Sequence, residues 1–308
     1  MTTQQGRTFP EAPVTPLTAG ALIDATGLGG LDRGQVLDVY KEYGAVLIRG
    51  LGLDRAGFVA FTESYLDEFM EYVGGANNDR GSAFGQSQTV LTVTGGAVAK
   101  LAIPLHGEMF YTEPRPATLF FCCITPAAED GQTTICDSVA LWNALPEDIQ
   151  AIFRERKLRY RRIYDEAAWT KAYRTDDLNE VRRLCREKGV ALTENADGTI
   201  ETVHVCHAWH ETPAGIGFIN SVLVWIAREY ISKMDDSRLR FEDGEELPID
   251  TVYKIHEISQ GLTQNIDWRP GDVAIVDNYR VMHGRRAYED DGRDIIMRLS
   301  LSPLPAAA

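Results

Sequence analysis

The segment WRPGDVAIVDNYRVMHGRRAY, residues 268–288, decides most of what the sequence predicts about the fold. Within it, DVAIVD (Asp272–Asp277) is a short apolar run of strand length, and His283 follows closely after it. The next apolar run, RDIIMRLSL (Arg293–Leu301), is also typical of a strand. The C-terminal part of the chain is therefore predicted to be β-structure with a histidine between two strands.

Working outward from this segment, strands and helices are predicted along the whole chain. AVLIRG (Ala45–Gly50), ATLFFCCI (Ala117–Ile124) and a β-like stretch from Gln86 to Thr94 are the other central strand predictions. Apolar spacing and capping residues predict helices at 31–43, 54–70, 139–156 with a break at Pro146, 175–188, 223–233 and 249–262. Strands at both ends with helices between them predict an α+β protein built around a β-sandwich or barrel.

The organisation of the chain indicates one domain. We find no internal repeat and no linker-like segment, so residues 1–308 are predicted to form a single domain. Pro10, Pro13 and Pro16 indicate an extended N-terminal arm over residues 1–16.

Composition restricts the possible partners. The 31 basic and 45 acidic side chains give a formal net charge of −14, which argues against binding nucleic acid or an anionic membrane surface. No apolar run approaches the length of a membrane span, and the N-terminus lacks the pattern of a signal peptide. The cysteines are odd in number, which favours reduced thiols and a cytoplasmic location; they are Cys122, Cys123, Cys136, Cys185 and Cys206.

Three residues form the pattern that carries chemistry. In IPLHGEMFY, His106 and Glu108 are two residues apart, so in a strand their side chains would share a face. His283 supplies a second imidazole. Two imidazoles and one carboxylate on one face of a metal leave three positions open, which suits non-haem Fe(II) and O₂ chemistry. An H-x-E pair alone is common, so its surroundings matter.

Four segments occur in a fixed order across the chain: IPLHGEMFY, PAAEDGQTTICDS, the 268–288 segment and the IIMRLSL strand. In this order they resemble the taurine dioxygenase/TfdA-like branch of the Fe(II)/2-oxoglutarate-dependent oxygenases. The glutamate in the triad resembles that of clavaminate synthase-like members. The resemblance implies a double-stranded β-helix (jelly-roll, cupin-like) core with helical and loop insertions, mainly within about 139–253. It also implies Fe(II) ligation by His106, Glu108 and His283.

The resemblance further implies a cosubstrate and a reaction. Thr133 and Arg298 match the residues that hold the distal carboxylate of 2-oxoglutarate, and a guanidinium offers a bidentate fork for such a group. With O₂, an enzyme of this family oxidises an unactivated C–H bond and releases succinate and CO₂. Hydroxylation is the default outcome, and desaturation, epoxidation or cyclisation are alternatives.

The substrate expected from the resemblance is a small amino-acid-like or organic acid, used in biosynthesis. Asp294, which shares a strand face with Arg298, is expected near the mouth of the site, where it would meet a cationic substrate group. A homo-oligomer is the default expectation for a soluble enzyme. The candidate substrate-contacting residues are Phe110, Tyr111, Arg80, Arg285, Arg293 and Asp294.

Other classes of function stay open at this stage. His204, Cys206, His207 and His210 could form a zinc site, although β alternation would divide them between two faces and favours packing. The triad could hold Zn²⁺ in a hydrolase, but no separate general base is evident. It could also belong to a metal-binding jelly-roll protein without catalysis. Such a site would not need Thr133 and Arg298.

Overall fold

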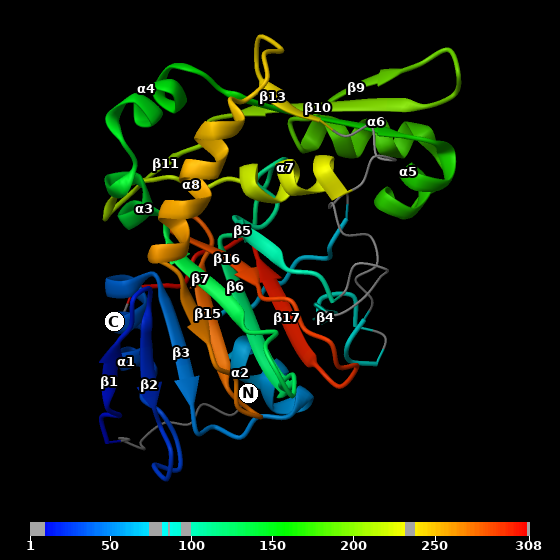
Figure 1. Ribbon diagram of the computed structural model, residues 1–308. Coiled ribbons are helices and arrows are strands. Elements are labelled where there is room, and N and C mark those ends of the chain that lie inside the picture. Colours follow the sequence, from blue (N-terminus) through cyan, green and yellow to red (C-terminus); the bar gives the residue numbers. More distant parts are fainter. Residues whose placement is uncertain (1–9, 74–81, 86, 94–99, 232–237, 307–308) are drawn as a thin grey trace.

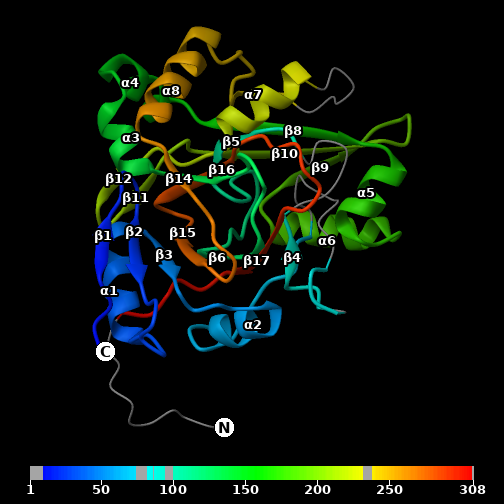
Figure 2. The same ribbon diagram turned by 60° about the horizontal axis from the view of Figure 1, so that its bottom comes forward.

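Two sheets that face each other form the centre of the protein (Figure 1, Figure 2). The computed structural model describes residues 10–73, 82–85, 87–93, 100–231 and 238–306. The larger sheet has the strand order β1 (Val14–Pro16), β2 (Ala21–Asp24), β3 (Ala45–Arg49), β15 (Val273–Asp277), β6 (Thr118–Thr125), β17 (Asp294–Ser300) and β4 (Leu91–Thr92). The smaller sheet has the order β14 (Gln264–Ile266), β7 (Thr133–Asp137), β16 (Val281–Arg285) and β5 (Ile103–His106). The predicted α+β fold with a jelly-roll core is confirmed.

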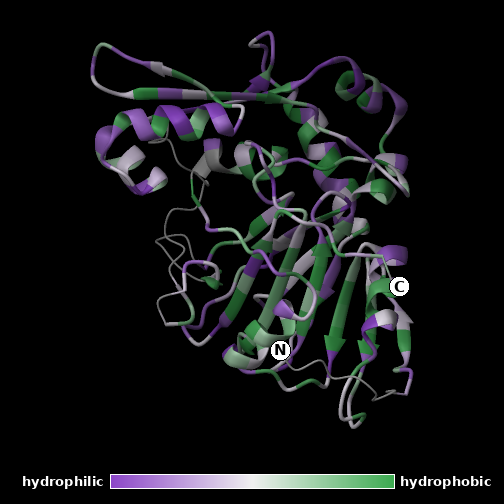
Figure 3. Ribbon diagram, turned by 180° about the vertical axis from the view of Figure 1, so that it is seen from behind, coloured by the Kyte–Doolittle hydropathy of each residue, from purple (hydrophilic) through white to green (hydrophobic). Residues whose placement is uncertain are grey.

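The central strands of the larger sheet are buried on both faces, which explains their continuous apolar sequences. Alternate residues of β6, such as Leu119 and Phe121, face the smaller sheet and join the main core. Their neighbours Phe120 and Cys122 face the opposite way, against α1 (Arg33–Tyr43) and α2 (Arg55–Glu63). Figure 3 shows the strands of this sheet mostly in the hydrophobic colour. Each central strand thus has an inner face toward the smaller sheet and an outer face toward the helices.

The N-terminal region partly departs from the sequence prediction. Residues 1–9 of the predicted extended arm lie outside the described residues, but Val14–Pro16 is a strand that pairs antiparallel with β2. Helix α1 ends at Gly44, whose φ of 72° is left-handed and typical of a helix terminus. Helix α2 is capped by Asp54, as predicted, yet it ends at Glu63 rather than near residue 70.

The elements between β7 and β14 form a layer across one end of the two sheets (Figure 1). This layer contains a sheet of order β13-β8-β10-β9 and a short hairpin of β11 with β12. Pro146 separates α3 from α4, as predicted. In chain order the elements are α3 (Ser138–Ala144), α4 (Glu147–Glu155), β8 (Leu158–Tyr164), α5 (Glu166–Tyr173), α6 (Leu178–Glu187), β9 (Ala191–Glu194), β10 (Ile200–Cys206), β11 (His210–Thr212), β12 (Gly215–Gly217), α7 (Val222–Ile231), β13 (Arg238–Phe241) and α8 (Ile249–Gly261).

Two further observations complete the fold. The stretch predicted as a strand over 86–94 forms a strand only at Leu91–Thr92, and part of it lies outside the described residues. In the portion of the chain that the structure describes, no helix is both long and apolar enough to cross a membrane.

Candidate active site

The three predicted metal ligands converge between the two sheets. His106, at the end of β5, lies directly opposite His283 of β16, so the strand pairing itself brings the two imidazoles together. The Oε2 atom of Glu108 lies 4.0 Å from Nε2 of His106 and 3.5 Å from Nε2 of His283. One ligand atom from each residue falls within 4.8 Å of the others. This distance fits three ligands on one face of a single ion.

The chemistry of these three side chains fits Fe(II). Nδ1 of His106 lies 2.9 Å from the carbonyl oxygen of Pro104. If that nitrogen donates its proton there, the lone pair of Nε2 is directed toward Glu108 and is available to a metal. Glu108 is only 2% exposed, and a buried carboxylate is costly unless it is paired or coordinates a metal. Two imidazoles and one carboxylate form a ligand set for non-haem iron with open positions.

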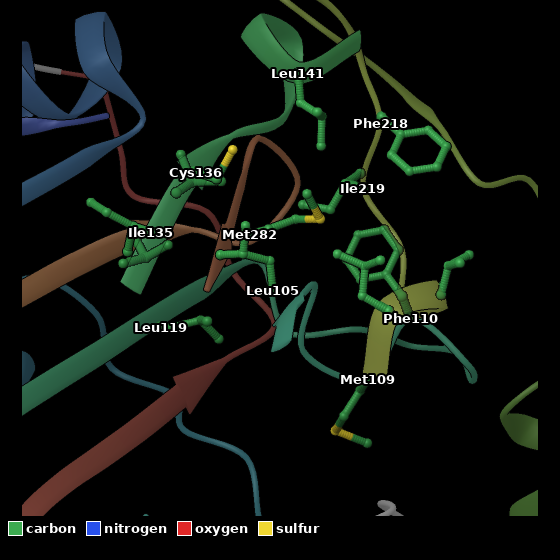
Figure 4. Close-up of a cluster of buried hydrophobic side chains, with 14 of the residues drawn as sticks. Leu105, Met109, Phe110, Leu119, Ile135, Cys136, Leu141, Phe218, Ile219 and Met282 are labelled. Atoms are coloured by element: carbon green, nitrogen blue, oxygen red, sulfur yellow. The ribbon is translucent and has the colours of Figure 1, made fainter. Parts of the chain in front are cut away.

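The turn that carries Glu108 is closely packed. A Cβ atom at Gly107 would lie 2.3 Å from the ring of Phe110 and 3.0 Å from Ile219, so only glycine fits between the two ligands. Figure 4 shows Phe110 beside Ile219 and Phe218, with Met109 pointing away from them. The inserted layer also binds this turn: the Gly107 N–H donates to the carbonyl of Asn220 at 2.8 Å.

A second cluster of polar side chains lies further along β7 and β16. Thr133 of β7 pairs in register with Arg285 of β16, on the face that also carries His283. The indole N–H of Trp268 donates to Oγ1 of Thr133 at 2.9 Å. Arg293 donates from Nε to the carbonyl of Gly131 at 2.8 Å, and the guanidinium groups of Arg285 and Arg293 lie 5.0 and 5.4 Å from the ring of Tyr288. Two buried guanidinium groups and one buried hydroxyl therefore converge here.

This second group has the electrostatic character of an anion site. In the described part of the chain, Nε of Arg285 and Nη1 of Arg293 are buried without a hydrogen-bond partner. Burial, and next to it the positive charge of Arg285, lowers the pKa of Arg293 to about 10. Burial also lowers the pKa of Arg285. A bound carboxylate would satisfy both orphaned donors and offset the like-charge repulsion.

The prediction that Arg298 holds the cosubstrate is wrong, because Arg298 is on the outer face of the larger sheet. It pairs in register with Phe120, whose ring belongs to the cluster under α1 and α2. Its Nη1 donates to Oγ1 of Thr62 at 2.7 Å, and its guanidinium lies 3.5 Å from the centre of the Phe69 ring. The sheet therefore separates Arg298 from the triad. Arg293, five positions earlier, occupies the inner side instead.

The expectation for Asp294 fails for the same reason. Asp294 shares the outer face with Arg298, as strand alternation predicts, but its carboxylate forms an ion pair with Arg55 of α2. It therefore does not lie at the mouth of the site. Arg80, another substrate candidate, lies outside the described residues.

The two aromatic substrate candidates have different surroundings. Phe110 is fully buried, with its ring against Tyr279 and the guanidinium of Arg115, so its visible role is packing under Gly107. The Tyr111 hydroxyl lies 3.1 Å from that of Tyr72, and its ring is 5.8 Å from that of Trp225. Tyr111 therefore joins the turn that carries Glu108 to helix α7 of the inserted layer.

The His204, Cys206, His207 and His210 residues do not gather into a metal site. Among the described residues, the only group of side chains with metal-ligating geometry is the His106, Glu108 and His283 triad. Nδ1 of His204 lies 3.2 Å from the Gly189 carbonyl, and the thiol of Cys206 donates to the Phe110 carbonyl. His207 and His210 contact the rings of Trp209 and Tyr279. Packing, the expectation that β alternation favoured, is what the structure shows.

Two buried residues of the 268–288 segment have contacts that the sequence did not predict. Trp268 holds Thr133, as described above, and Asn278 makes three hydrogen bonds around Glu108 and Pro116. Their position could have drawn attention to them: Trp268 lies shortly before the apolar strand DVAIVD, Asn278 directly follows it, and both side chains can form hydrogen bonds.

Known proteins are similar to this chain over most of its length. The family model described as taurine catabolism dioxygenase TauD, TfdA family, matches residues 12–300. The dapdiamide synthesis protein DdaC of Enterobacter agglomerans is 23% identical over 303 residues, covering 91% of this chain and 89% of that protein. A clavaminate synthase-like protein of Arabidopsis thaliana is 28% identical over 271 residues, covering 82% and 80%.

Solved structures agree in fold. The crystal structure of PvcB from Pseudomonas aeruginosa matches with a TM-score of 0.60 at 14% identity, covering 97% of this chain and 95% of that one. The fold, the convergence of the triad and the match over residues 12–300 lead to one assignment. The chain belongs to the TauD/TfdA family of Fe(II)- and 2-oxoglutarate-dependent dioxygenases.

Proposed function

We propose that His106, Glu108 and His283 hold the catalytic iron and that Thr133, Arg285 and Arg293 hold the far carboxylate of 2-oxoglutarate. The observation that carries this proposal is the pair of buried guanidinium groups with orphaned donors on the same side of the sheet as the triad. Without an anion between them, these two groups would be a costly arrangement.

The spacing along β16 suits this cosubstrate. Arg285 follows His283 by two residues on one face, which in a strand corresponds to about 7 Å. That distance matches the length of a five-carbon dicarboxylate with its keto-acid end at the triad. Because the Thr133 hydroxyl accepts the Trp268 N–H, its own proton is directed elsewhere and can be donated to the carboxylate.

The chemistry that bound Fe(II) would supply is O₂ activation coupled to decarboxylation of 2-oxoglutarate. For hydroxylation, the overall reaction converts a substrate C–H bond, O₂ and 2-oxoglutarate into an alcohol, succinate and CO₂. The chain itself orients both reactants and excludes water between the sheets and the inserted layer. Hydroxylation is the default proposal, and desaturation, epoxidation or cyclisation would require a different substrate pose.

For the substrate, we propose a small amino-acid-like or organic acid used in biosynthesis. The name of the DdaC relative, a dapdiamide synthesis protein, supports a biosynthetic role. Tyr111 stays a candidate substrate contact, because it lies next to the turn that carries Glu108. We further propose a cytoplasmic location, supported by five cysteines that are all free in the structure, and the absence of a nucleic-acid or membrane partner, supported by the net charge of −14.

Metal-dependent turnover tests the proposal. Apo-protein loaded with Fe(II) should form succinate from 2-oxoglutarate and consume O₂, slowly without substrate and faster with a productive amino acid from a panel. Protein loaded with Zn(II) should form none. Turnover of an ester or amide with Zn(II), without any succinate formation with Fe(II), would favour the hydrolase alternative. Tight metal binding with neither activity would favour a metal-binding protein without catalysis.

A further inference from the structure

The turn that carries Glu108 is held by a side chain from a distant part of the sequence. Asn278 lies in the connection between β15 and β16 and is fully buried. Its Oδ1 accepts the backbone N–H of Glu108 at 2.8 Å, while its Nδ2 donates to the carbonyls of Glu108 at 3.0 Å and of Pro116 at 2.8 Å. One amide group therefore binds both backbone polar groups of a metal-ligand residue.

The local backbone needs such support. Met109, directly after Glu108, has a φ of 60°, a left-handed conformation that a residue with a side chain adopts only when its surroundings impose it. On the other side of Glu108, Gly107 is confined between Phe110 and Ile219. A relaxation of this turn would rotate the Glu108 carboxylate relative to the two imidazoles.

From these contacts we propose that Asn278 is a positioning residue that fixes the carboxylate of Glu108 against His106 and His283. The inference rests on the proposed metal site. Asn278 belongs to the strand connection that leads into β16, and β16 carries His283. A single short segment therefore supplies one ligand and positions another, so the relative placement of the two is set by one connection.

The amide is chemically specific for this role. It uses one acceptor and both N–H donors at once, a combination that no carboxylate or hydroxyl offers. Leucine at this position would keep the branched shape of the side chain and remove all three hydrogen bonds. Aspartate would keep the acceptor for the Glu108 N–H, lose both donors and place a buried carboxylate oxygen against the carbonyls of Glu108 and Pro116, which makes it a second variant with a different defect.

A matched control exists in Gln35 of α1, on the outer side of the larger sheet. Its Oε1 accepts the Ala12 N–H at 3.0 Å and its Nε2 donates to the Ala12 carbonyl at 2.7 Å, so its amide also binds both backbone polar groups of one residue. Replacing Gln35 removes backbone hydrogen bonds far from the turn that carries Glu108. The experiment titrates the full-length apo-proteins with Mn(II) in a calorimeter and measures urea unfolding of each without metal.

For Asn278→Leu we expect a 10- to 100-fold loss of Mn(II) affinity, the range typical when a group that orients a ligand is removed. Asn278→Asp should also lose Mn(II) affinity. Gln35→Leu should lose some stability but keep Mn(II) affinity within about twofold. If Asn278→Leu does not fold, the comparison between Asn278→Asp and Gln35→Leu decides.

Two outcomes would overturn the inference. One is wild-type Mn(II) affinity in both Asn278 variants, and the other is an equal loss of affinity in the Gln35 control, which would indicate general destabilisation. Failure of the proposed function is distinguishable from both, because the wild-type protein itself would then show no Mn(II) binding that depends on His106.

Discussion

Arg293 and Arg298 lie close together in the sequence, yet they meet opposite environments. Arg293 immediately precedes β17 and reaches Gly131 and Tyr288 on the inner side, whereas Arg298 lies over Phe69 on the outer side. The pairing of β17 with β6 shifts register between Asp294 and Ile295 and is regular from Ile295 onward. Both residues carry the same chemical group. Their different surroundings therefore arise because alternate positions along the strand face opposite sides of the sheet.

Replacing these arginines should separate their roles. Arg293→Ala should weaken 2-oxoglutarate binding by about 30-fold or more, because it removes one partner of a buried charge pair worth about 2 kcal/mol or more. Arg298→Ala should leave the cosubstrate affinity within about threefold while lowering the free energy of unfolding, since it removes the contact with Phe69 and Thr62. Calorimetric titration with Mn(II)-loaded protein measures both affinities. The reverse pattern would restore Arg298 as the cosubstrate residue.

His204 should give the protein a pH-dependent stability. Burial lowers its pKa below the ordinary value of 6.5, and its Nε2 atom is buried without a hydrogen-bond partner in the described structure. The unfolded chain therefore takes up the proton first as the pH falls, so the free energy of unfolding should decrease from pH 7 to pH 5. His204→Gln should flatten this slope in urea denaturation, and the exposed His256→Gln should not. An unchanged slope in His204→Gln would show that His204 is not responsible.

At the scale of elements, the link between β5 and the Glu108 turn depends on one glycine. Gly107→Ala should place a methyl group against the Phe110 ring and cost about 1–3 kcal/mol of stability through overpacking, with weakened metal binding as the ligands shift. Gly261→Ala at the end of α8 is the control, because nothing lies within 4 Å of its added Cβ, and stability should be unchanged or slightly higher. Urea midpoints and Mn(II) titration measure both effects. Normal metal affinity in Gly107→Ala would contradict the tight packing of this turn.

The sequence predicted most central elements because their apolar runs are local signals, whereas the triad was predicted from the family resemblance. The apolar runs became β3, β6, β15 and β17, and the helices predicted at 223–233 and 249–262 became α7 and α8. It did not predict β8, whose outward arginines Arg159 and Arg161 pair with Glu201 on β10 and obscure an alternating strand pattern. Such pairing is a tertiary property that one segment does not reveal.

The proposed cosubstrate residues were only partly predictable. Thr133 was predicted from the family resemblance, and the structure pairs it in register with Arg285. Arg298 was also predicted from the resemblance, but a match in sequence position does not tell which face of a sheet is inner. Trp268 and Asn278 carry no metal-binding or acid–base chemistry, so their contacts became evident only from the assembled fold.

At the scale of the whole molecule, the site joins three layers. The larger sheet lines it, the smaller sheet supplies both histidines, and the inserted layer contacts Gly107 through Asn220 and Ser221 (Figure 1). Ligands that bind between these layers should therefore stabilise the entire fold, since binding to the folded state alone adds about 2.7 kcal/mol at a hundredfold excess over Kd.

Thermal unfolding tests this coupling. Mn(II) together with 2-oxoglutarate should raise the Tm of the wild-type protein by several degrees. His106→Ala should show little of this increase, because it lacks a ligand at the centre of the three layers. An equal rise in Tm for His106→Ala would place the ligands elsewhere on the protein.

The most direct test of the central claim is an anaerobic titration of the apo-protein with Fe(II) and 2-oxoglutarate, monitored by the visible charge-transfer absorption of the chelate. The account predicts a band in the wild type that is lost in His106→Ala, weakened in Arg293→Ala and retained in Arg298→Ala. No band in the wild type, despite tight iron binding, would contradict the claim that this site binds 2-oxoglutarate at a triad of His106, Glu108 and His283.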